Sequence, residues 1–296
     1  MKIFNFGDNL KERTVLLLGY FDGLHKGHLE LVKKAKDVAK VKKASVTLFT
    51  FDDNFPILVK GDKCIFTTSE KLSIYEKYGV DNVLIAKPDK EFLSLSKTDF
   101  LNVILSKYEI DCVIFGEDYT FGYKGEGKAD FLCEYLENKG VEHYKIDAVY
   151  MYGSKVSSSL IKEYLEFGKM KEVSALLGYD YCVEGEVIHG VHIGNKMGFP
   201  TLNTAFPINK KILRRGVYKT YTEIDGKIYN SITNFGTQPT FDRYNFVIET
   251  YVLNFNQDVY GKTVKVYFTE FIRGLIKFNS MEDLIVQIKE DLKIYD

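Results

Sequence analysis

Two histidines in a glycine-rich turn are the residues of this 296-residue chain best placed to do chemistry. His25 and His28 lie three positions apart, with Gly27 between them, shortly after an apolar run at residues 15–18. Such a run is typical of a buried parallel strand that ends at the carboxyl edge of a sheet. The helix expected from about residue 28 would point its first N–H groups at that edge, which favours a bound anion. Either histidine alone could merely cap a helix, but together they indicate a phosphate site that stabilises a phosphoryl group in transfer.

The string GYFDGLHKGH, residues 19–28, resembles the His-x-Gly-His signature of the nucleotidylyltransferase superfamily. It looks more specifically like the flavin-directed branch, the amino-terminal half of bacterial FAD synthetases. The resemblance implies that His25 and His28 are catalytic and stabilise charge on the α-phosphate of ATP. It also implies ATP binding by four other residues of the turn, which are Gly19, Phe21, Asp22 and Gly27.

Two later segments extend this resemblance. FGEDYTFG, residues 115–122, leaves a strand at the same predicted edge, and the family uses this place to hold the adenylate, here with Asp118 and Phe121. By itself Asp118 would be a turn-former. The overlapping match of residues 122–129 to GxxxxGK lacks the final Ser or Thr, so we interpret it as accidental.

A run of serines at residues 157–159 predicts a capped helix, and by itself would predict nothing more. In the family a Ser-Ser-Thr-x-Ile-Arg motif grips the triphosphate at this place, which implies ATP binding by Ser158, Ser159 and Lys162. Lysine replaces the family's arginine and lacks its planar fork for bidentate phosphate contact. We therefore expect slower adenylyl transfer or weaker ATP binding in this half.

The second half of the chain carries a different set of residues. GNKMGFPTLN, residues 194–203, offers glycines for close approach to phosphate and two oxygen ligands for Mg²⁺, Thr201 and Asn203, which alone would indicate a turn or a strand end. GFPTLN closely resembles the magnesium-ATP loop of riboflavin kinases, and NFGTQPTF and ETYVLNF follow in the family's order. The resemblance implies that ATP or flavin is bound by Gly190, Gly194, Gly198, Pro200, Asn234 and Arg273.

Glu249 begins the segment ETYVLNF. A glutamate on an alternating strand most often faces water, but in riboflavin kinases this residue is the base that takes the proton of the ribityl 5′-hydroxyl. Three nearby positions depart from the family, because Tyr251 replaces a histidine, Asn254 replaces an aspartate and Leu275 stands in a segment that lacks the usual acid. We expect an active kinase with an altered flavin rim.

Strands and helices alternate in the first half, which predicts a Rossmann-like parallel sheet with helices on both faces. The strands are expected at residues 15–18, 44–51, 82–86 and 112–116, and the helices at 27–40, 68–78, 97–108 and 156–166.

After a further helix at residues 168–179, strands follow without helices between them, which predicts a closed antiparallel barrel. The barrel strands are expected at residues 181–188, 216–224, 227–233, 246–253 and 262–271, with a final helix at 281–295. The length allows two domains, which we place at residues 1–178 for the adenylyltransferase and 179–296 for the kinase.

Composition limits the partners. A formal net charge of −1 offers no general attraction to nucleic acid or anionic lipid, and the four cysteines form no CxxC pair that would indicate zinc. The amino terminus does not resemble a secretory signal, and no apolar run is long enough to cross a membrane. We expect a cytoplasmic monomer or weak homo-oligomer that binds small molecules, without nucleic acid or membrane partners.

The resemblance covers nearly the whole chain and implies a bifunctional enzyme. It would use ATP and Mg²⁺ to phosphorylate riboflavin to FMN, and then adenylylate FMN to FAD. Three alternatives remain from the sequence: a riboflavin kinase whose adenylyltransferase half is weakened or lost, a non-catalytic flavin-sensing regulator, and a nucleotidylyltransferase with another phosphate acceptor.

Overall fold

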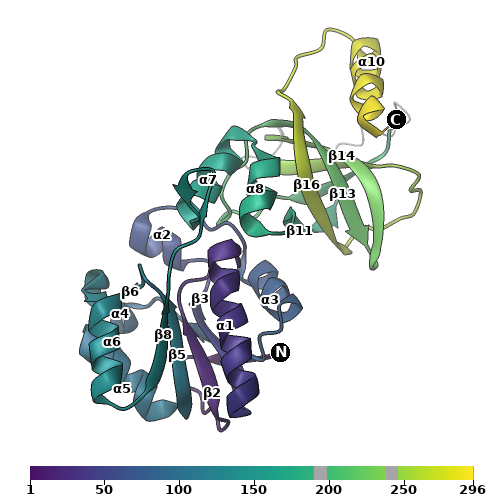
Figure 1. Ribbon diagram of the computed structural model, residues 1–296. Coiled ribbons are helices and arrows are strands. Elements are labelled where there is room, and N and C mark those ends of the chain that lie inside the picture. The colour runs from purple at the N-terminus through teal and green to yellow at the C-terminus, as the bar shows by residue number, and fades with distance from the viewer. Residues whose placement is uncertain (190–198, 238–245, 296) are drawn as a thin grey trace. The chain divides into compact units, whose positions relative to one another are not determined.

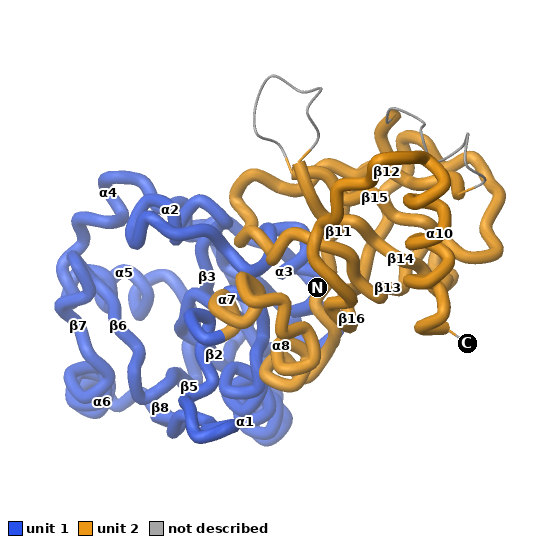
Figure 2. Tube along the Cα trace, turned by 90° about the horizontal axis from the view of Figure 1, so that it is seen from above, with its two compact units in different colours: residues 1–160 blue, residues 161–296 orange. Residues whose placement is uncertain are grey.

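The computed structural model describes residues 1–189, 199–237 and 246–295. Its chain divides into two compact units, Met1–Leu160 and Ile161–Asp296, coloured separately in Figure 2. The main sheet of the first unit is parallel, and that of the second unit is antiparallel.

A six-stranded parallel sheet forms the centre of the first unit (Figure 1). Its strands are β1 (Lys2–Asn5), β2 (Thr14–Leu18), β3 (Ser45–Phe51), β4 (Asn82–Ala86), β5 (Ile110–Gly116) and β8 (Glu142–Ile146). They lie in the order β1-β4-β3-β2-β5-β8, and every pair is parallel. The order reverses at β2, so the segments that follow β2 and β5 flank the crevice where sheets of this kind bind ligands.

Helices cover both faces of this sheet, as predicted. Those of the first unit are α1 (Lys26–Lys42), α2 (Phe55–Lys60), α3 (Thr68–Lys77), α4 (Lys90–Leu93), α5 (Lys97–Lys107) and α6 (Ala129–Asn138). Figure 1 shows α1 on one side of the sheet and α5 and α6 on the other. Leu16 and Leu18 of β2 belong to one buried cluster with Phe100 of α5 and Leu132 of α6. Burial from both sides explains why the four residues of β2 after Thr14 are all apolar.

Two strands of this sheet were not predicted. The edge strand β1 is mostly exposed, and β8 alternates without a clear apolar pattern, so neither carries the continuous apolar run by which buried parallel strands are recognised. The GxxxxGK match, residues 122–129, overlaps a hairpin in which β6 (Thr120–Phe121) pairs with β7 (Gly127–Lys128) and the short helix η1 (Tyr123–Gly125) lies between them. Glu126 of this hairpin accepts a hydrogen bond from the Lys97 N–H.

Two helices, α7 (Ser158–Phe167) and α8 (Met170–Leu177), precede a closed six-stranded barrel in the second unit. Its strands are β11 (Tyr181–Ile188), β12 (Thr201–Ala205), β13 (Gly216–Ile224), β14 (Lys227–Thr237), β15 (Phe246–Val252) and β16 (Thr263–Arg273). They close in the order β11-β12-β15-β14-β13-β16, and helix α10 (Met281–Leu292) and η2 (Lys293–Tyr295) follow. The predicted antiparallel barrel and final helix are therefore confirmed.

Local turn chemistry and core packing both fit this barrel. Asp225 and Gly226 have φ values of 49° and 75°, as a two-residue hairpin turn requires. Tyr218, Phe235 and Phe268 are fully buried, and a chain of hydrogen-bonded hydroxyls accompanies them, formed by Thr220, Thr222, Ser231, Thr233 and Thr250. The sequence prediction missed β12, because we expected its residues to form a loop around magnesium.

Candidate functional sites in the two units

The turn after β2 is fixed by buried contacts on its protein side. Phe21 has a φ of 49° and is 1% exposed, and a Cβ on Gly19 would lie 2.8 Å from its ring. The Tyr75 hydroxyl donates to the Phe21 carbonyl at 2.6 Å. Asp22 is also 1% exposed, and its carboxylate accepts the Ile65 N–H at 3.0 Å. The side chains of Phe21 and Asp22 therefore hold the turn in place and face the protein.

The two predicted histidines lie together where this turn enters α1. Their rings stack with centroids 3.6 Å apart and an interplanar angle of 15°. His25 is the N-cap of α1, and its Nδ1 accepts the His28 N–H at 3.3 Å. A Cβ on Gly27 would lie 3.2 Å from the His25 ring, so glycine at this position leaves room for the ring.

Hydrogen bonds assign the tautomers of the neutral rings. His25 Nδ1 accepts a bond, so its proton is on Nε2, which can donate to a phosphate oxygen. His28 Nδ1 lies 2.9 Å from the Gly23 carbonyl, which can only accept, so this nitrogen carries the proton of the His28 ring. The pair therefore offers an N–H donor on one ring and a lone pair on the other.

Burial keeps both rings neutral near pH 7. Desolvation, followed by the neighbouring His28, lowers the pKa of His25 well below its ordinary value. Desolvation also lowers the pKa of His28 to about 4, although the Gly23 carbonyl and Asp118 act in the opposite direction. Without a bound anion, both rings are therefore neutral hydrogen-bonding groups near pH 7.

The turn after β5 supplies Asp118, whose carboxylate raises the pKa of His28 and so lies close enough for its charge to act on that ring. Its Oδ2 forms an ion pair with Lys155 Nζ at 2.8 Å. Phe121 is 5% exposed, and its ring packs in the core against Phe100 and Tyr119. Any contact of Phe121 with a nucleotide would therefore come from its backbone.

The serine run begins α7, as predicted. Ser157 Oγ accepts the Leu160 N–H at 3.3 Å, so Ser157 caps the helix. Ser158 is half-buried and Ser159 is exposed. Lys162 follows Ser158 by four residues and so lies on the same face of α7, where its side chain is buried.

In the second unit four of the predicted kinase residues lie in a row across the outer face of the barrel. The pairing runs from Asn203 of β12 to Glu249 of β15, then to Asn234 of β14, Val217 of β13 and Arg273 of β16. The next residues along these strands, among them Thr250 and Thr233, point into the barrel. At about 4.8 Å between strands, the row is about 19 Å long.

Glu249 lies between two asparagines in this row. Asn234 Nδ2 donates to Glu249 Oε2 at 3.2 Å, which orients the carboxylate, while Asn234 Oδ1 is buried without a hydrogen-bond partner in the described part of the chain. Asn203 is 6% exposed, and Thr201, two residues away on the same strand, shares its face. Tyr251 pairs with Thr201 and has an edge contact with the Phe199 ring, with centroids 5.3 Å apart.

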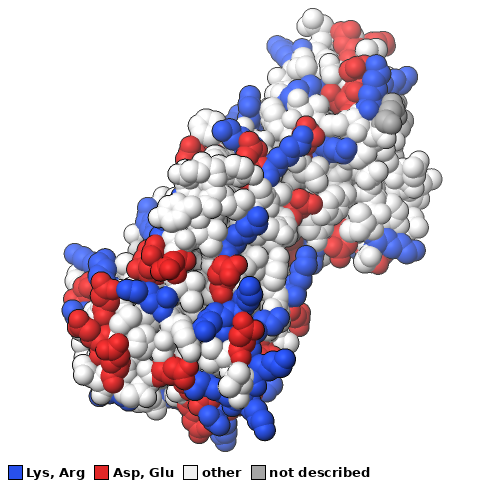
Figure 3. Space-filling model, in the orientation of Figure 1, with Lys and Arg blue, Asp and Glu red and all other residues white. Residues whose placement is uncertain are grey.

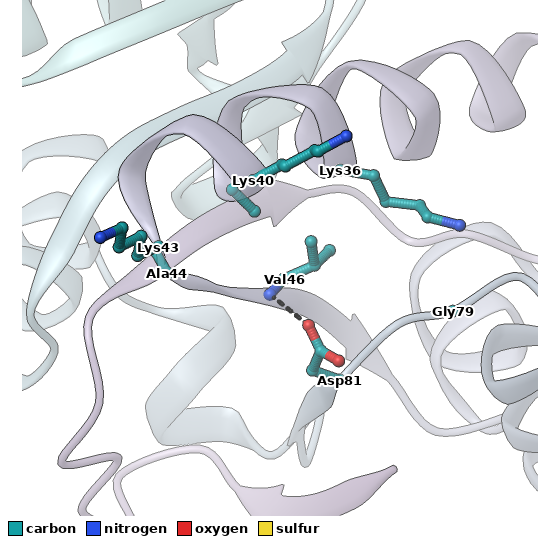
Figure 4. A pocket seen from close by; sticks show the side chains of 8 residues that line it. Lys36, Lys40, Lys43, Ala44, Val46, Gly79 and Asp81 are labelled. Atoms are coloured by element: carbon teal, nitrogen blue, oxygen red, sulfur yellow. Dashed lines mark hydrogen bonds between the residues drawn. The ribbon is translucent and has the colours of Figure 1, made fainter.

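A pocket of about 380 Å³ lies elsewhere in the first unit (Figure 4). It is lined by Lys36, Lys40 and Lys43 and by Asp81, whose carboxylate accepts the Val46 N–H at 2.8 Å. These residues lie where β3 and β4 begin, at the amino edge of the sheet. Because ligands of such sheets bind beyond the carboxyl ends of the strands, we do not assign the chemistry to this pocket.

Comparisons with known proteins agree with the two-unit structure. The family model of FAD synthetase matches residues 8–160, and that of riboflavin kinase matches residues 177–296. The chain is 32% identical over 282 residues to a bifunctional riboflavin kinase/FMN adenylyltransferase from Listeria monocytogenes, covering 94% of this chain and 90% of the relative. A protein of the same name from Bacillus subtilis is 31% identical over 286 residues, again covering 94% and 90%. The chain belongs to the bifunctional riboflavin kinase/FMN adenylyltransferase family.

A crystal structure titled as a macrolide-efflux protein from Streptococcus pneumoniae has the same fold, with a TM-score of 0.90 and 28% identity over 99% of this chain and 98% of that one. None of the helices within residues 1–189, 199–237 and 246–295 has both the length and the apolar character of a membrane span. The FAD synthetase match ends at residue 160, where the first compact unit of this family member also ends.

The structure gives Arg273 a partner that sequence reasoning did not find. Its guanidinium binds the carboxylate of Asp291 on α10 through bonds of 2.8 and 2.7 Å, and Asp291 is 5% exposed. Gln287 donates to the same carboxylate at 3.0 Å. Arg273 therefore fastens α10 to the barrel at one end of the row. Asp291 carried no sequence signal, because an aspartate near the end of a helix more often faces water.

Four further residues predicted to bind ATP or flavin in the kinase half are Pro200 and three glycines. Pro200 is exposed next to β12. Gly190, Gly194 and Gly198 lie outside the described residues. Lys155, in contrast, was not predicted although it lies beside Asp118; its only sequence signal is a basic residue directly before the capped helix.

Proposed function

We propose that the two activities of this family are divided between the two units of this enzyme. The barrel unit moves the γ-phosphoryl group of ATP to riboflavin, and the sheet edge of the first unit moves AMP from a second ATP to FMN. Pyrophosphate is released in the second reaction. The observation that supports this division is that each unit brings together its own set of predicted residues, the stacked histidines in one and the Asn203–Glu249–Asn234 row in the other.

In the kinase reaction Glu249 is the general base. Its carboxylate takes the proton of the ribityl 5′-hydroxyl as the hydroxyl oxygen attacks the γ-phosphorus. The hydrogen bond from Asn234 to Oε2 fixes the orientation in which the carboxylate meets the hydroxyl. Positioning of this kind carries much of the rate of phosphoryl transfer, because no covalent intermediate with the protein is needed.

Magnesium fits the neighbouring donor set. Thr201 and Asn203 offer a hydroxyl and an amide oxygen on one face of β12, and Mg²⁺ prefers a few oxygen ligands completed by substrate phosphates and water. Among the described residues, no cluster of three or more His, Cys, Asp or Glu side chains could hold a metal ion without such help. When bound with ATP, the ion would neutralise charge on the phosphates.

In the adenylyl transfer, a phosphate oxygen of FMN attacks the α-phosphorus of ATP, and the bond to the pyrophosphate oxygen breaks. The His25 Nε2–H donates to an α-phosphate oxygen as charge builds on it. His28 lies stacked on that ring and gains a proton more readily when an anion is near, because a neighbouring negative charge raises the pKa of a histidine. Ser158, Ser159 and Lys162 would hold the phosphate chain at the start of α7.

A kinase with a weakened adenylyltransferase half is the second candidate, and Lys162 is the observation that favours it. A non-catalytic regulator, whether a flavin sensor or an RNA binder, has less support. For RNA binding in particular, positive and negative side chains are interspersed on the face drawn in Figure 3, without a basic stripe. We propose the functional boundary at residues 178/179, which assigns α7 and α8 to the adenylyltransferase half, and a monomeric or weakly associating enzyme in the cytoplasm.

A product assay tests the proposed function. The enzyme is incubated with riboflavin, ATP and Mg²⁺, and flavins are resolved by chromatography over time. We expect FMN to appear first and FAD to follow. Accumulation of FMN without FAD would support the second candidate, and flavin binding without ATP consumption would overturn both.

A further inference from the structure

Lys71 is a buried lysine on α3 that contacts the ends of two strands of the parallel sheet. It is 1% exposed, and its Nζ donates to the carbonyl of Phe51, the last residue of β3, at 2.7 Å. The same Nζ lies 4.7 Å from the centroid of the Tyr20 ring, in the turn of residues 19–28 that carries the paired histidines. One ammonium group therefore joins the end of β3 to this histidine turn.

Two other buried side chains hold the same edge of the sheet. Tyr75, four residues after Lys71 on α3, donates to the Phe21 carbonyl at 2.6 Å, and Thr50 of β3 donates to the Tyr20 carbonyl at 2.5 Å. Together with Lys71, they bind three successive carbonyl oxygens of the two strand ends. A carbonyl oxygen carries partial negative charge, so bonds that hold these oxygens toward the protein favour an anion on the other side.

Lys71 also lies among acidic groups. Burial lowers its pKa, and nearby charges raise it, in the order Asp22, Cys64, Asp53 and Asp52. The Asp22 carboxylate is 1% exposed and accepts the Ile65 N–H at 3.0 Å. A buried negative charge in a turn that binds phosphate would repel the substrate, and buried charges are stable when an opposite charge lies near them. The ammonium of Lys71 supplies that opposite charge.

We propose that Lys71 is a positioning residue for the adenylyl transfer. Its ammonium fixes the end of β3 against the histidine turn and balances the buried charge of Asp22, so that the phosphates meet His25 and His28 in the reactive geometry. Because Lys71 is buried, it acts through these neighbours and does not touch the substrates. The inference rests on the proposed function, because it assigns a residue to the reaction of the first unit.

K71M tests this role. Methionine keeps most of the volume of the side chain but removes the charge and the hydrogen bond to Phe51. We expect kcat/KM for FMN-to-FAD conversion to fall about tenfold to a hundredfold, as a small displacement of catalytic groups predicts. Unchanged riboflavin kinase activity shows that the chain is folded. Absence of FMN-to-FAD conversion by the unaltered enzyme would instead overturn the proposed function.

Lys210 of the second unit provides a matched control. It is 0% exposed, its Nζ donates to the Cys182 carbonyl at 2.7 Å, and this Nζ lies 4.8 Å from the centroid of the Tyr181 ring. K210M thus removes an equally buried lysine with similar contacts, and it should leave kcat/KM for FMN-to-FAD conversion unchanged. An equal loss in K71M and K210M would mean that any buried lysine has this effect, and would overturn the inference.

A double variant separates charge balance from packing. In K71M the carboxylate of Asp22 loses the nearby positive charge, and D22N removes the negative charge as well. We therefore expect D22N/K71M to convert FMN to FAD faster than K71M alone. If the loss in the double variant equals the product of the two single losses, the residues are not coupled and the inference is overturned.

The pH profile of FMN-to-FAD conversion gives a test that does not require K71M to fold. The rate should decline as Lys71 loses its proton at alkaline pH, below its ordinary pKa of 10.5. D22N should move this decline to lower pH, because the charge of Asp22 raises the pKa of Lys71. Burial raises the pKa values of Tyr20 and Tyr75, so both stay protonated, and C64S, which removes the nearby thiol, should keep the decline. A decline that D22N does not move, or that C64S removes, would contradict the role of Lys71.

Discussion

The two sites are built in opposite ways. In the first unit the proposed adenylyltransferase residues lie in turns beyond the ends of parallel strands, where His25 and His28 are near neighbours along the chain. In the second unit the proposed kinase residues lie on the regular outer face of a barrel, where Asn203, Glu249 and Asn234 come from three different strands. A turn site depends on local backbone geometry, whereas a strand site depends on pairing register.

This difference predicts how each site fails. A one-residue shift of β15 would turn Glu249 into the barrel, because side chains alternate along a strand. In the histidine turn, the close packing of Gly19 on Phe21 and the bond from Ile65 to Asp22 fix the backbone. His25 and His28 lie three residues apart, so their proximity does not depend on strand register. Variants at single side chains should therefore separate the two reactions cleanly.

The largest effect should come from E249Q. Glutamine keeps the size of the side chain and can still bond Asn234, but it cannot accept the hydroxyl proton. We expect kcat for FMN formation to fall about 10²–10⁴-fold, with FMN-to-FAD conversion unchanged. Steady-state assays of each half-reaction check this. A kinase that keeps its rate would show that Glu249 is not the base.

Next in size is the effect of H28A. His28 supports His25, the proposed transition-state donor, by stacking on its ring. Misplacing that donor should cost about as much as losing it, typically about 10²–10³ in rate. We expect that loss in FMN-to-FAD conversion, with normal riboflavin phosphorylation as the internal control. Loss of both reactions would mean that the variant is misfolded or that the sites are not separate.

D291N should have a smaller effect, on the stability of the kinase unit and on its KM for riboflavin. The asparagine side chain could still accept one hydrogen bond, but Arg273 would lose its buried charge partner. We expect a loss of about 1–3 kcal/mol in the stability of the barrel unit and a raised KM for riboflavin. Chemical denaturation and kinase kinetics measure the two effects.

The matched control for this change is D283N, an exposed aspartate in the first turn of the same helix. It should change stability by less than about 1 kcal/mol. An equal effect of D291N and D283N on the riboflavin KM would contradict a role for the Arg273 contact in shaping the flavin site.

Much of the first unit could be predicted because its signals are local. The apolar run of β2, the glycines and the paired histidines are adjacent in the sequence, and the structure brings them together as expected. The ion pair of Lys155 with Asp118 was not predicted, because Asp118 lies 37 residues earlier and the two are brought together only by the fold. Contacts of that kind leave no periodic pattern.

In the second unit the sequence predicted a barrel but not all of its strands. Thr201 and Asn203 were expected in a loop, yet they lie on β12, because a segment that starts with Phe-Pro-Thr carries no clear alternation. The position of Glu249 beside Asn203 and Asn234 follows from pairing register, which composition does not reveal. The Arg273–Asp291 contact likewise depends on where α10 docks.

The last effect concerns stability rather than rate and follows from the burial of His28. His28 has a pKa of about 4 in the folded chain and about 6.5 when unfolded, so the unfolded chain takes up its proton first as the pH falls. Stability should therefore decline between about pH 6.5 and pH 4, by no more than about 3 kcal/mol from this residue. In H28Q that contribution is absent, and its stability relative to the unaltered enzyme should improve as the pH falls. Urea unfolding of both proteins at pH 7 and pH 5 checks the sign. A free energy of unfolding that falls more in H28Q than in the unaltered enzyme between pH 7 and pH 5 would contradict it.

Mixing the two single-site variants tests the separation of the reactions most directly. With riboflavin, ATP and Mg²⁺, E249Q alone should leave riboflavin unchanged and H28A alone should stop at FMN. An equimolar mixture should form FAD after a lag in which FMN accumulates, because H28A supplies the FMN that E249Q adenylylates. A mixture that forms no FAD, or single variants that each lose both half-reactions, would contradict two independent sites on one chain.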